Sequence, residues 1–402
     1  MKRTIFVFVM ALFMGSLVFS QTNQTRYVAV QNTSLKSSAG FLANDLGTLS
    51  LGATVTLIGE NGKWSQVKAG NHTGWVASAS LSARKVVASG STAISASEVA
   101  LAGKGLNQAT EIEYRKGGLN YAQVDNMEKN TVSTKDLKQF IESGRLLKGD
   151  GNSTDFTAET DDYTMEDAYY LGRTVAANIL RYYPVYQNRE LTEYVNKICQ
   201  AIVINSPQPV IFNGYSVLIL DSNEFNAFAT SGGHIFVTRR LVESITSEDM
   251  LAAVVAHELA HIILRHGIAI INETRLNNDL SFVAGRAASI AGDNSEQARQ
   301  AANLRASLAN SIDTWIKNGY SQSQEYEADL EAIVLLSKAG YDPSALLEML
   351  RALQQIQGSQ MSGIYSTHPG AEQRIANVDK LNYSSQNTRQ YRTARFKAAL
   401  KK

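Results

Sequence analysis

The sequence predicts a multidomain chain in which a small all-β domain precedes a larger, mainly helical α+β domain. Residues 26–84 contain short β-rich runs separated by turn signals such as Glu60-Asn61-Gly62. From about residue 160 onward, long segments with helical periodicity alternate with a few short apolar runs that are typical of strands. A chain of 402 residues is long enough to bury separate hydrophobic cores in two or three domains.

Charge and cysteine content argue against several kinds of protein. The chain has 38 basic and 37 acidic residues, and this balance gives no indication of a nucleic acid or an anionic surface as partner. One cysteine, Cys199, cannot form an internal disulfide framework. It falls at a helical core position between Ile198 and Ile202, so we interpret it as a small core residue.

Residues 1–20 have the pattern of a secretory signal peptide. Lys2 and Arg3 precede an apolar run, and small residues favour cleavage after Ser20. The run is about long enough to cross a bilayer, so a retained membrane anchor is the alternative. No later segment is apolar enough to be a span. We therefore expect an exported protein without a membrane span in the mature chain, periplasmic rather than secreted.

Residues 26–84 are predicted to form a small barrel or sandwich, because several short strands alternate with tight turns. The expected strands are Tyr27–Val30, Thr54–Leu57, Trp64–Val67 and Gly74–Ala77. Gly62-Lys63-Trp64 and Gly74-Trp75-Val76 resemble the corresponding strands of bacterial SH3-like domains. The resemblance implies an SH3-like barrel that either binds a peptide or cell-wall ligand or acts as a tether. We interpret Trp64 and Trp75 as core residues.

Residues 85–155 are predicted to be a linker or small helical region. A Ser/Ala-rich stretch is followed by one clear helix, capped at Ser133 or Thr134 and ended by Gly144. The second domain is predicted at 160–382, and residues 383–402 are predicted to be a C-terminal tail.

The second domain is predicted to contain helices and two short strands. The helices are Asp167–Tyr183, Glu190–Ile204 and an apolar helix over Thr246–Gly267, and the strands are Ser216–Leu220 and His234–Thr238. Thr246 and Asp249 form a capping-box-like start to the apolar helix. Nearly every other position in this helix is apolar, so we expect it to be buried on all sides.

Three polar residues interrupt the apolar helix, in the pattern His257-Glu258-Leu259-Ala260-His261. Residues four apart lie on one face of a helix, so His257 and His261 can bind the same metal ion. Glu258 is one residue further round, where it can reach a water at that ion. The alternative is a buried histidine pair that is satisfied by hydrogen bonds. This HExxH pattern on a well-capped helix favours a zinc site.

A catalytic zinc needs a third protein ligand. His266 lies about 180° round the helix from His257, so we exclude it. Glu325 and Asp329 share one face of a later helix, where the first could bind the metal and the second could orient a ligand histidine, while Glu327 should point elsewhere. By charge pattern alone, an acidic face exposed to solvent is equally consistent.

A resemblance decides between these alternatives. The HExxH helix followed by Glu325-Tyr326-Glu327-Ala328-Asp329 resembles the HtpX/BepA-like zinc metallopeptidases, which are gluzincins. Two further segments agree in family order: Asn226–Ala229 with Gly232–Thr238, and Ser366-Thr367-His368-Pro369 with Arg374-Ile375. Over about 163–380 the resemblance implies a zincin-type domain with one zinc per chain. It implies His257, His261 and Glu325 as ligands, with Asp329 and Arg374 in the outer shell.

The resemblance also implies a function. Glu258 would be the general base of peptide hydrolysis. His368 would either stabilise the oxyanion or, in a resting form, block the fourth zinc position. A third interpretation is that His368 lies in a plain surface turn. The strand at Ile235, Phe236 and Val237 would be the edge strand beside the cleft and would bind extended substrate by strand addition. This mode suits unfolded or misfolded envelope proteins and quality control. Alternatives are a zinc-binding chaperone-like or adaptor protein and a cell-wall peptide hydrolase. The role of residues 267–320 stays open.

Overall fold

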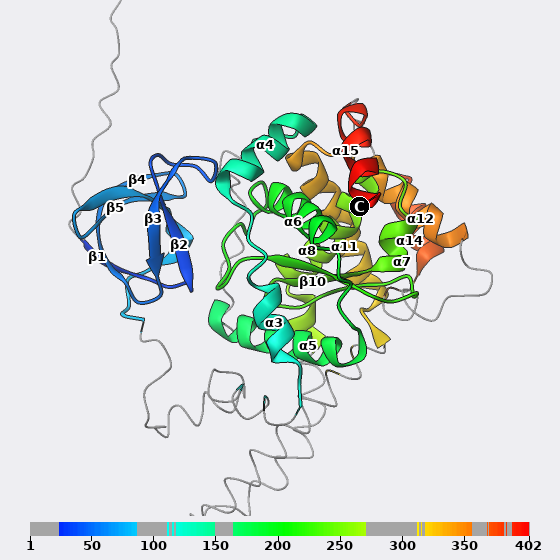
Figure 1. Cartoon of the computed structure of the whole chain (residues 1–402), viewed down its shortest axis with the longest axis horizontal. Helices are drawn as coiled ribbons and strands as arrows, with labels where there is room; N and C mark the ends of the chain where they lie inside the picture. Colours follow the sequence, from blue (N-terminus) through cyan, green and yellow to red (C-terminus); the bar gives the residue numbers. More distant parts are fainter. Residues whose placement is uncertain are drawn as a thin grey trace, which may run out of the picture.

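The computed structural model describes residues 24–86, 118–148, 164–270, 318–355, 370–381 and 388–401, together with residues 111, 115, 312, 315, 368 and 383. The predicted signal peptide, most of the predicted linker before residue 118 and most of the 267–320 segment lie outside the described residues. A small β domain lies beside a larger domain of helices around a short sheet (Figure 1). This arrangement confirms the predicted fold class.

The β domain is one strongly bent sheet with the strand order β3-β2-β6-β5-β4-β1-β7. Its strands are β1 (Gln24–Val28), β2 (Asn32–Lys36), β3 (Asp45–Ser50), β4 (Thr54–Asn61), β5 (Trp64–Ala69), β6 (His72–Ala77) and β7 (Leu81–Ser82). The turn between β4 and β5 is at Gly62, whose φ of 59° favours glycine. The four predicted strands are present, and β2, β3 and β7 are additional. Alternate apolar side chains of β2, β4, β5 and β6 form a separate core, which consists of Leu35, Val55, Leu57, Val67 and Val76.

The β domain contacts the larger domain through its first loops. The backbone N–H of Gln31 donates to the carbonyl of Phe212 at 2.7 Å. Lys36 donates to Thr134 at 2.9 Å and pairs with Asp45 at 2.7 Å. Phe41 packs against the main core of the larger domain and against the ring of Trp64. Trp64 is buried within this packing, which agrees with its interpretation as a core residue.

The larger domain is built around a sheet of three short strands, β8 (Ser216–Leu220), β9 (Ala227–Ala229) and β10 (His234–Thr238), in the order β8-β10-β9. β10 pairs with β8 in parallel and with β9 antiparallel. Successive side chains point to opposite faces, so Ile235 and Val237 join one core cluster and Phe236 the other. Helices cover both faces, and all three strands are therefore buried.

The strand order corrects one prediction. Ile235, Phe236 and Val237 were expected at the edge of the sheet, where a substrate strand could pair. They lie on the central strand, and neighbours on both sides use the hydrogen-bonding groups of β10. The prediction is wrong because a short apolar run shows that a strand is buried without showing which strands flank it. The edge strands are β8 and β9.

Two helical layers enclose the sheet (Figure 1). α3 (Tyr121–Met127) and α5 (Met165–Tyr182) cover one face, where Phe236 lies in their apolar cluster. α6 (Arg189–Val203) and α8 (Glu248–Ile263) cover the other face. The observed bounds of α5 and α6 agree with the predicted helices to within about two residues, the usual uncertainty of helix ends.

The remaining helices in the described residues are α4 (Thr134–Gly144), α7 (Arg239–Ser244), α11 (Gln322–Ala339), α12 (Ser344–Gln355), α14 (Ala371–Val378) and α15 (Gln390–Leu400). Of these, α11, α12 and α15 pack against α8, α14 packs against α11 and α12, α4 against α6 and α15, and α7 against β10. α4 is capped by Ser133, as predicted. The segment expected to be a tail contains α15, whose Phe396 and Arg392 are buried. Within the described residues, no helix has the length and apolar character needed to cross a membrane.

Candidate active site

The site is built on α8, which is shorter than the sequence predicts. Ser247, and not Thr246, caps its start by accepting from the N–H of Met250 at 3.2 Å. The helix ends at Ile263 because Arg265 adopts a left-handed conformation with φ of 60°, so the chain turns before Gly267. All residues of α8 are buried. The break after Ile263 has a direct consequence for His266, described below.

His257 and His261 direct imidazole nitrogens at one point, as their spacing predicts. Their Nε2 atoms are 3.1 Å apart. The side chain of His257 is 5% exposed and that of His261 is fully buried. Asp329 lies on the opposite side of the His257 ring, with Oδ1 3.1 Å from Nδ1. This contact fixes the ring orientation, which is the outer-shell position that the sequence analysis expected for Asp329.

α11 brings Glu325 against the histidine pair. Its Oε1 lies 3.4 Å from His261 Nε2, and its Oε2 lies 3.4 Å from His257 Nε2. The N-terminus of α11 is held by a capping box between Ser321 and Gln324, which fixes the first turn where Glu325 sits. Glu325 and Asp329 share one face of α11, so both carboxylates reach the site.

Arg374, in α14, pairs with both carboxylates. Its Nη1 donates to Glu325 Oε2 at 2.6 Å, and its Nε and Nη2 donate to Asp329 at 2.8 and 2.7 Å. These buried carboxylates need such a partner, because an unpaired buried charge is very unfavourable. Arg374 thereby holds two carboxylates in place, one beside each side of the His257 ring.

His368 also points into the cluster. Its Nδ1 is 2.9 Å from Glu325 Oε1 and 3.4 Å from His257 Nε2. Its Nε2 faces the carbonyl of Ala227 at 3.4 Å and Glu258 Oε1 at 3.6 Å. Because His368 is buried, the reading of this residue as a plain surface turn is wrong.

Four ligand atoms thus meet with the dimensions of a metal site. The nearest nitrogen or oxygen atoms of His257, His261, Glu325 and His368 all lie within 4.8 Å of one another. Four of these separations are between 2.9 and 3.4 Å. A tetrahedral zinc site with bonds of about 2.0–2.1 Å has ligand–ligand distances of about 3.3 Å. The donor atoms and their spacing therefore fit a tetrahedral zinc ion.

The electrostatics of the cluster are those of closely coupled groups. Burial lowers the pKa of His261 and raises that of Glu258. Burial raises the pKa of Glu325, but His368 and Arg374 outweigh it and hold the pKa well below its usual range. Burial and Arg374 lower the pKa of His257, whereas hydrogen bonds to Asp329 and Glu325 raise it more, to about 9. Glu325 is thus an anion, as a metal ligand must be.

Glu258 differs from the other acidic groups of the site. Its carboxylate is buried, and no residue of the described part of the chain hydrogen-bonds to its Oε2. A buried polar atom without a partner is costly and calls for an explanation. A free carboxylate oxygen beside a metal cluster has the arrangement needed to hold and deprotonate a water.

Three residues make contacts at the site that the sequence analysis did not predict. His266 Nδ1 lies 2.9 Å from His261 Nδ1, and His266 Nε2 lies 3.1 Å from Glu327. The helix break at Arg265 brings His266 back, so it contacts a ligand histidine although it is not among the clustered ligand atoms. Glu327 was expected to point elsewhere, and it instead partners His266. Tyr320 stacks on the His261 ring at 3.7 Å. No sequence signal marks Tyr320.

β9 forms the edge of the sheet beside this cluster. Alternate residues of an antiparallel strand direct their backbone groups to opposite sides, and those of Asn226 and Thr230 face β10. Ala227 and Ala229 therefore direct theirs outward. The carbonyl of Ala227 faces His368, and that of Ala229 accepts from Tyr320 at 3.4 Å. The backbone N–H of Ala227 donates to the side chain of Asn226.

Comparison with known proteins agrees with this geometry. Residues 186–382, which contain every residue of the cluster, match the profile of peptidase family M48. This part of the chain is therefore similar to peptidase family M48. Residues 32–82 match the profile of the bacterial SH3 domain, in agreement with the barrel. The M48 match implies a metal, and the His257–His261–Glu325–His368 cluster is where the chain could hold it.

Several named proteins are similar to this chain. The beta-barrel assembly-enhancing protease of Escherichia coli O157:H7 is 28% identical over 241 residues, which are 60% of this chain and 47% of that protein. The metalloprotease LoiP of Escherichia coli K12 is 28% identical over 48% of this chain and 70% of its own length. The mitochondrial metalloendopeptidase OMA1 of Schizosaccharomyces pombe is 26% identical over 47% of this chain. The chain thus spans about half the length of the assembly-enhancing proteases that it matches.

Proposed function

We propose that this protein is an exported zinc endopeptidase that hydrolyses unfolded or misfolded envelope proteins. The observation that carries the proposal is the convergence of His257, His261 and Glu325 beside Glu258, whose Oε2 has no hydrogen-bond partner in the described chain. A protein that only bound zinc would have no use for a free buried carboxylate at this position. This argues against a chaperone-like or adaptor role.

Each residue of the cluster has a defined part in the proposed reaction. Zinc bound by His257, His261 and Glu325 would polarise the scissile carbonyl and lower the pKa of the attacking water. Glu258 accepts the proton of that water and later donates it to the leaving amine. Asp329 holds the ring of His257, and Arg374 holds both Asp329 and Glu325. The substrate would need to lie extended along β9, so that the carbon of its scissile carbonyl faces the water held by Glu258.

We further infer that the described arrangement is a resting form. His368 Nδ1 takes the place of a fourth ligand, where a substrate carbonyl or water would otherwise go. The outward carbonyls of β9 are at the same time in contact with His368 and Tyr320, so a substrate strand would have to replace both contacts. Because His368 would block this position, we favour a resting role for His368 over a role in stabilising an oxyanion. Catalysis would then require His368 to move.

Strand addition at β9 supports a preference for unfolded substrates. Pairing through backbone groups requires an extended segment and reads little of its sequence. Folded proteins rarely offer such a segment, whereas misfolded proteins do. The barrel supports a tethering role, because Trp64 is buried against Phe41 and the first loops of the barrel contact the larger domain. Cell-wall hydrolysis, suggested only by the barrel, is the alternative.

The central test is metal analysis and casein digestion on wild type and Glu258→Gln. We expect one zinc per chain in both, and a loss of about 10²–10⁴-fold in activity for Glu258→Gln, the range for removal of a general base. Glu243→Gln, on the surface helix α7, is the matched control and should retain activity. Each protein is also assayed with His368→Ala, so that a resting form is not mistaken for inactivity. Equal digestion with and without Glu258 would contradict the mechanism.

Substrate class and export have their own tests. Purified peptidoglycan in the same assay distinguishes cell-wall hydrolysis from proteolysis. Digestion of unfolded casein alongside a folded protein tests quality control: cleavage of the folded protein alone would contradict the proposed role.

N-terminal sequencing tests export: the sequence of the protein recovered from the periplasm should begin after Ser20. An uncleaved N-terminus would favour the membrane anchor.

A further inference from the structure

Tyr320 lies where the metal-ligand cluster meets the edge strand β9, and the proposed reaction gives it no chemical part. It comes directly before Ser321, which caps α11, the helix that carries Glu325. Its ring stacks on the ring of His261, with centroids 3.7 Å apart and an interplanar angle of 10°. Its hydroxyl donates to the carbonyl of Ala229 at 3.4 Å. One side chain therefore contacts both a candidate metal ligand and the strand along which substrate would lie.

The ring of Tyr320 is held in place by its neighbours. Trp315 packs edge-on against it with centroids 5.7 Å apart, and the rings of His266 and His368 lie at 6.0 and 5.9 Å. Tyr320 and Trp315 are each 5% exposed. Because this packing fixes the ring, the hydroxyl is the part of the side chain that can change partner, since its proton rotates about the C–O bond.

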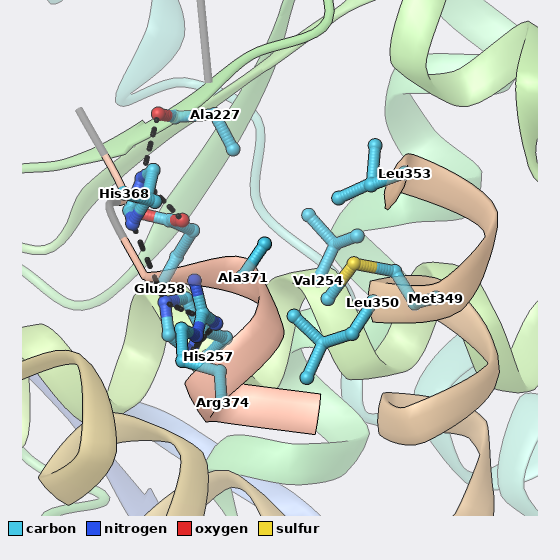
Figure 2. Close-up of a pocket in the computed structure, with 10 residues that line it drawn as sticks. All are labelled: Ala227, Val254, His257, Glu258, Met349, Leu350, Leu353, His368, Ala371 and Arg374. Atoms are coloured by element: carbon cyan, nitrogen blue, oxygen red, sulfur yellow. Dashed lines mark hydrogen bonds and ion pairs between the residues drawn. The ribbon is translucent and has the colours of Figure 1, made fainter. Parts of the chain in front are cut away.

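Side chains from two different segments cover the outward carbonyls of β9. Figure 2 shows His368, three residues before α14, in contact with the carbonyl of Ala227. Tyr320 covers the carbonyl of Ala229. Alternate residues of a strand are about 6.6–6.8 Å apart, so the two carbonyls are successive pairing positions for a substrate strand. Movement of His368 alone would open only the first of them.

The contact at Ala229 is one that a substrate can replace. Ala229 is buried, and a buried carbonyl without a partner is unfavourable. In the resting form the Tyr320 hydroxyl supplies the partner, but 3.4 Å is long for an O–H···O hydrogen bond. A backbone N–H of a paired strand would approach to about 2.9 Å and would be the stronger partner. The hydroxyl thus covers the carbonyl until a segment with an N–H at this position arrives.

We propose that the Tyr320 hydroxyl is a second blocking contact on the substrate edge, separate from His368, and that it makes binding depend on a backbone N–H opposite Ala229. The inference rests on the proposed peptidase function and states which segments its site accepts. Proline has no N–H, so a segment with proline opposite Ala229 cannot displace the hydroxyl. The site therefore selects segments that lie extended over both outward positions of β9, which unfolded chains provide.

The first experiment measures peptide binding, which does not depend on catalysis. The zinc-loaded protein carries Glu258→Gln and His368→Ala, so that it is inactive and the first blocking contact is absent. Fluorescent peptides carry a hydroxamate group, which binds zinc and so fixes their register along β9. One series has this group at the N-terminal end and the other at the C-terminal end. Anisotropy then gives the affinities with and without Tyr320→Phe.

The Tyr320 hydroxyl lies at one end of the edge, so only the series that extends past Ala229 should respond. In that series we expect Tyr320→Phe to bind about two- to tenfold more tightly, the range for one hydrogen bond that no longer has to be broken. Zinc content should not change, because the ring that stacks on His261 is retained. Unchanged or weaker binding in both series would overturn the inference.

Tyr215→Phe is the matched control. Tyr215 is 4% exposed, and its hydroxyl donates to the carbonyl of Gln208 at 2.8 Å. It lies directly before β8, at the other edge of the sheet, so its change should leave peptide affinity unaltered. Thermal melts confirm that each variant folds. An equal gain in Tyr215→Phe would indicate a general loosening of the domain and would refute the blocking contact.

The second experiment locates the contact on the peptide. Single backbone N-methyl groups remove one N–H at a time from the responding peptide. At the position opposite Ala229 we expect Tyr320→Phe to give no gain, because this peptide has no N–H to donate, and proline there should have the same effect. At the other positions the gain should persist. A gain at every position, or at none, would contradict the dependence on one N–H.

Metal analysis and casein digestion distinguish this inference from the proposed function. If one zinc is bound and digestion requires Glu258, but Tyr320→Phe gives no gain, only the inference is overturned. If Tyr320→Phe gives the gain but digestion does not require Glu258, the proposed mechanism is overturned and the blocking contact stands.

Discussion

At the scale of single residues, the ligand histidines are each held by a partner on the ring nitrogen away from the cluster. Asp329 contacts Nδ1 of His257, and His266 contacts Nδ1 of His261. Such partners fix the ring orientation and raise the basicity of the ligand nitrogen. Asp329 was predicted in this role, whereas His266 was considered only as a ligand. His266 in turn contacts Glu327, whose side chain lies at the surface.

The contact of His266 with His261 predicts a role in metal affinity. His266→Leu removes the partner of the buried Nδ1 of His261, so we expect zinc to bind about 10–100-fold more weakly. Glu327→Gln should have a smaller effect, because the Glu327 side chain is 61% exposed. Competition with a chelator measures both. His72→Gln, at an exposed position in the barrel, is the control; an unchanged affinity in His266→Leu would contradict the assigned role.

The place of His368 in the cluster predicts that its removal increases activity. In His368→Ala the fourth position and the carbonyl of Ala227 are released, so we expect casein digestion to rise. Activity should rise about tenfold for each ~1.4 kcal/mol by which the resting form is more stable than the form with His368 moved away. If His368 instead stabilised the oxyanion, activity would fall about 10²–10³-fold. The direction of the change therefore decides between the two roles.

At the scale of elements, the start of α8 is held from outside by the C-terminal helix α15. Arg392 donates to both oxygens of Asp249 at 2.6 and 2.9 Å, and both residues are fully buried. Arg395 pairs with Glu248, which also accepts from Tyr341 at 3.0 Å. Asp249 and Glu248 lie in the first turn of α8, where negative charge is favourable. The C-terminal segment thus anchors the helix that carries the HExxH residues.

This anchoring predicts that Arg392→Met is strongly destabilising. The change leaves Asp249 buried without its charged partner, and breaking such a pair costs about 3–5 kcal/mol. Chemical denaturation followed by circular dichroism measures the loss. Arg351→Met is the matched control, because Arg351 pairs with Asp379 at the surface and should cost at most about 1 kcal/mol. Adding Asp249→Asn to Arg392→Met should restore part of the stability; equal stability of the two arginine variants would contradict the anchoring role.

The contact between α5 and the turn before β10 predicts an unusual effect at Gly172. By helix propensity alone, Gly172→Ala should stabilise the protein by about 1 kcal/mol. In the structure a methyl group at this position would lie 2.1 Å from the backbone nitrogen of Gly232. We therefore expect a loss of about 1–3 kcal/mol, measured by chemical denaturation. Gly267→Ala, where nothing lies within 4 Å of the new methyl, is the control. Stabilisation by Gly172→Ala would show that the contact can relax.

At the scale of the whole molecule, the barrel, the sheet and α8 form a continuous series of contacts. The barrel touches the loop at Phe212 and the start of α4, and α4 in turn packs against α6 and α15. The small sheet lies between two helical layers, so its edge strand β9 is fixed beside the zinc-ligand cluster. The cluster therefore depends on segments far apart in the chain, from α8 to α14.

Several features of the site could be predicted because they depend on local spacing. His257 and His261 share a face of one helix, and Glu325 and Asp329 share a face of another, by helical geometry alone. The capped helix at Ser133–Gly144 and the strands β8 and β10 were predictable from periodicity and turn residues. The helix end near Arg265 was not, because a left-handed arginine leaves no mark in the sequence and Gly267 offered a more usual stop.

The sequence by itself determined that His257 and His261 share one face of α8, their pairing with an acidic helix and the order of the two domains, because each follows from residue types at fixed helical or strand spacing. Only the tertiary structure decided which strand is the edge, that His266 returns to His261, and that His368 enters the cluster. These depend on how separate elements pack, and burial drives packing without regard to distance along the chain.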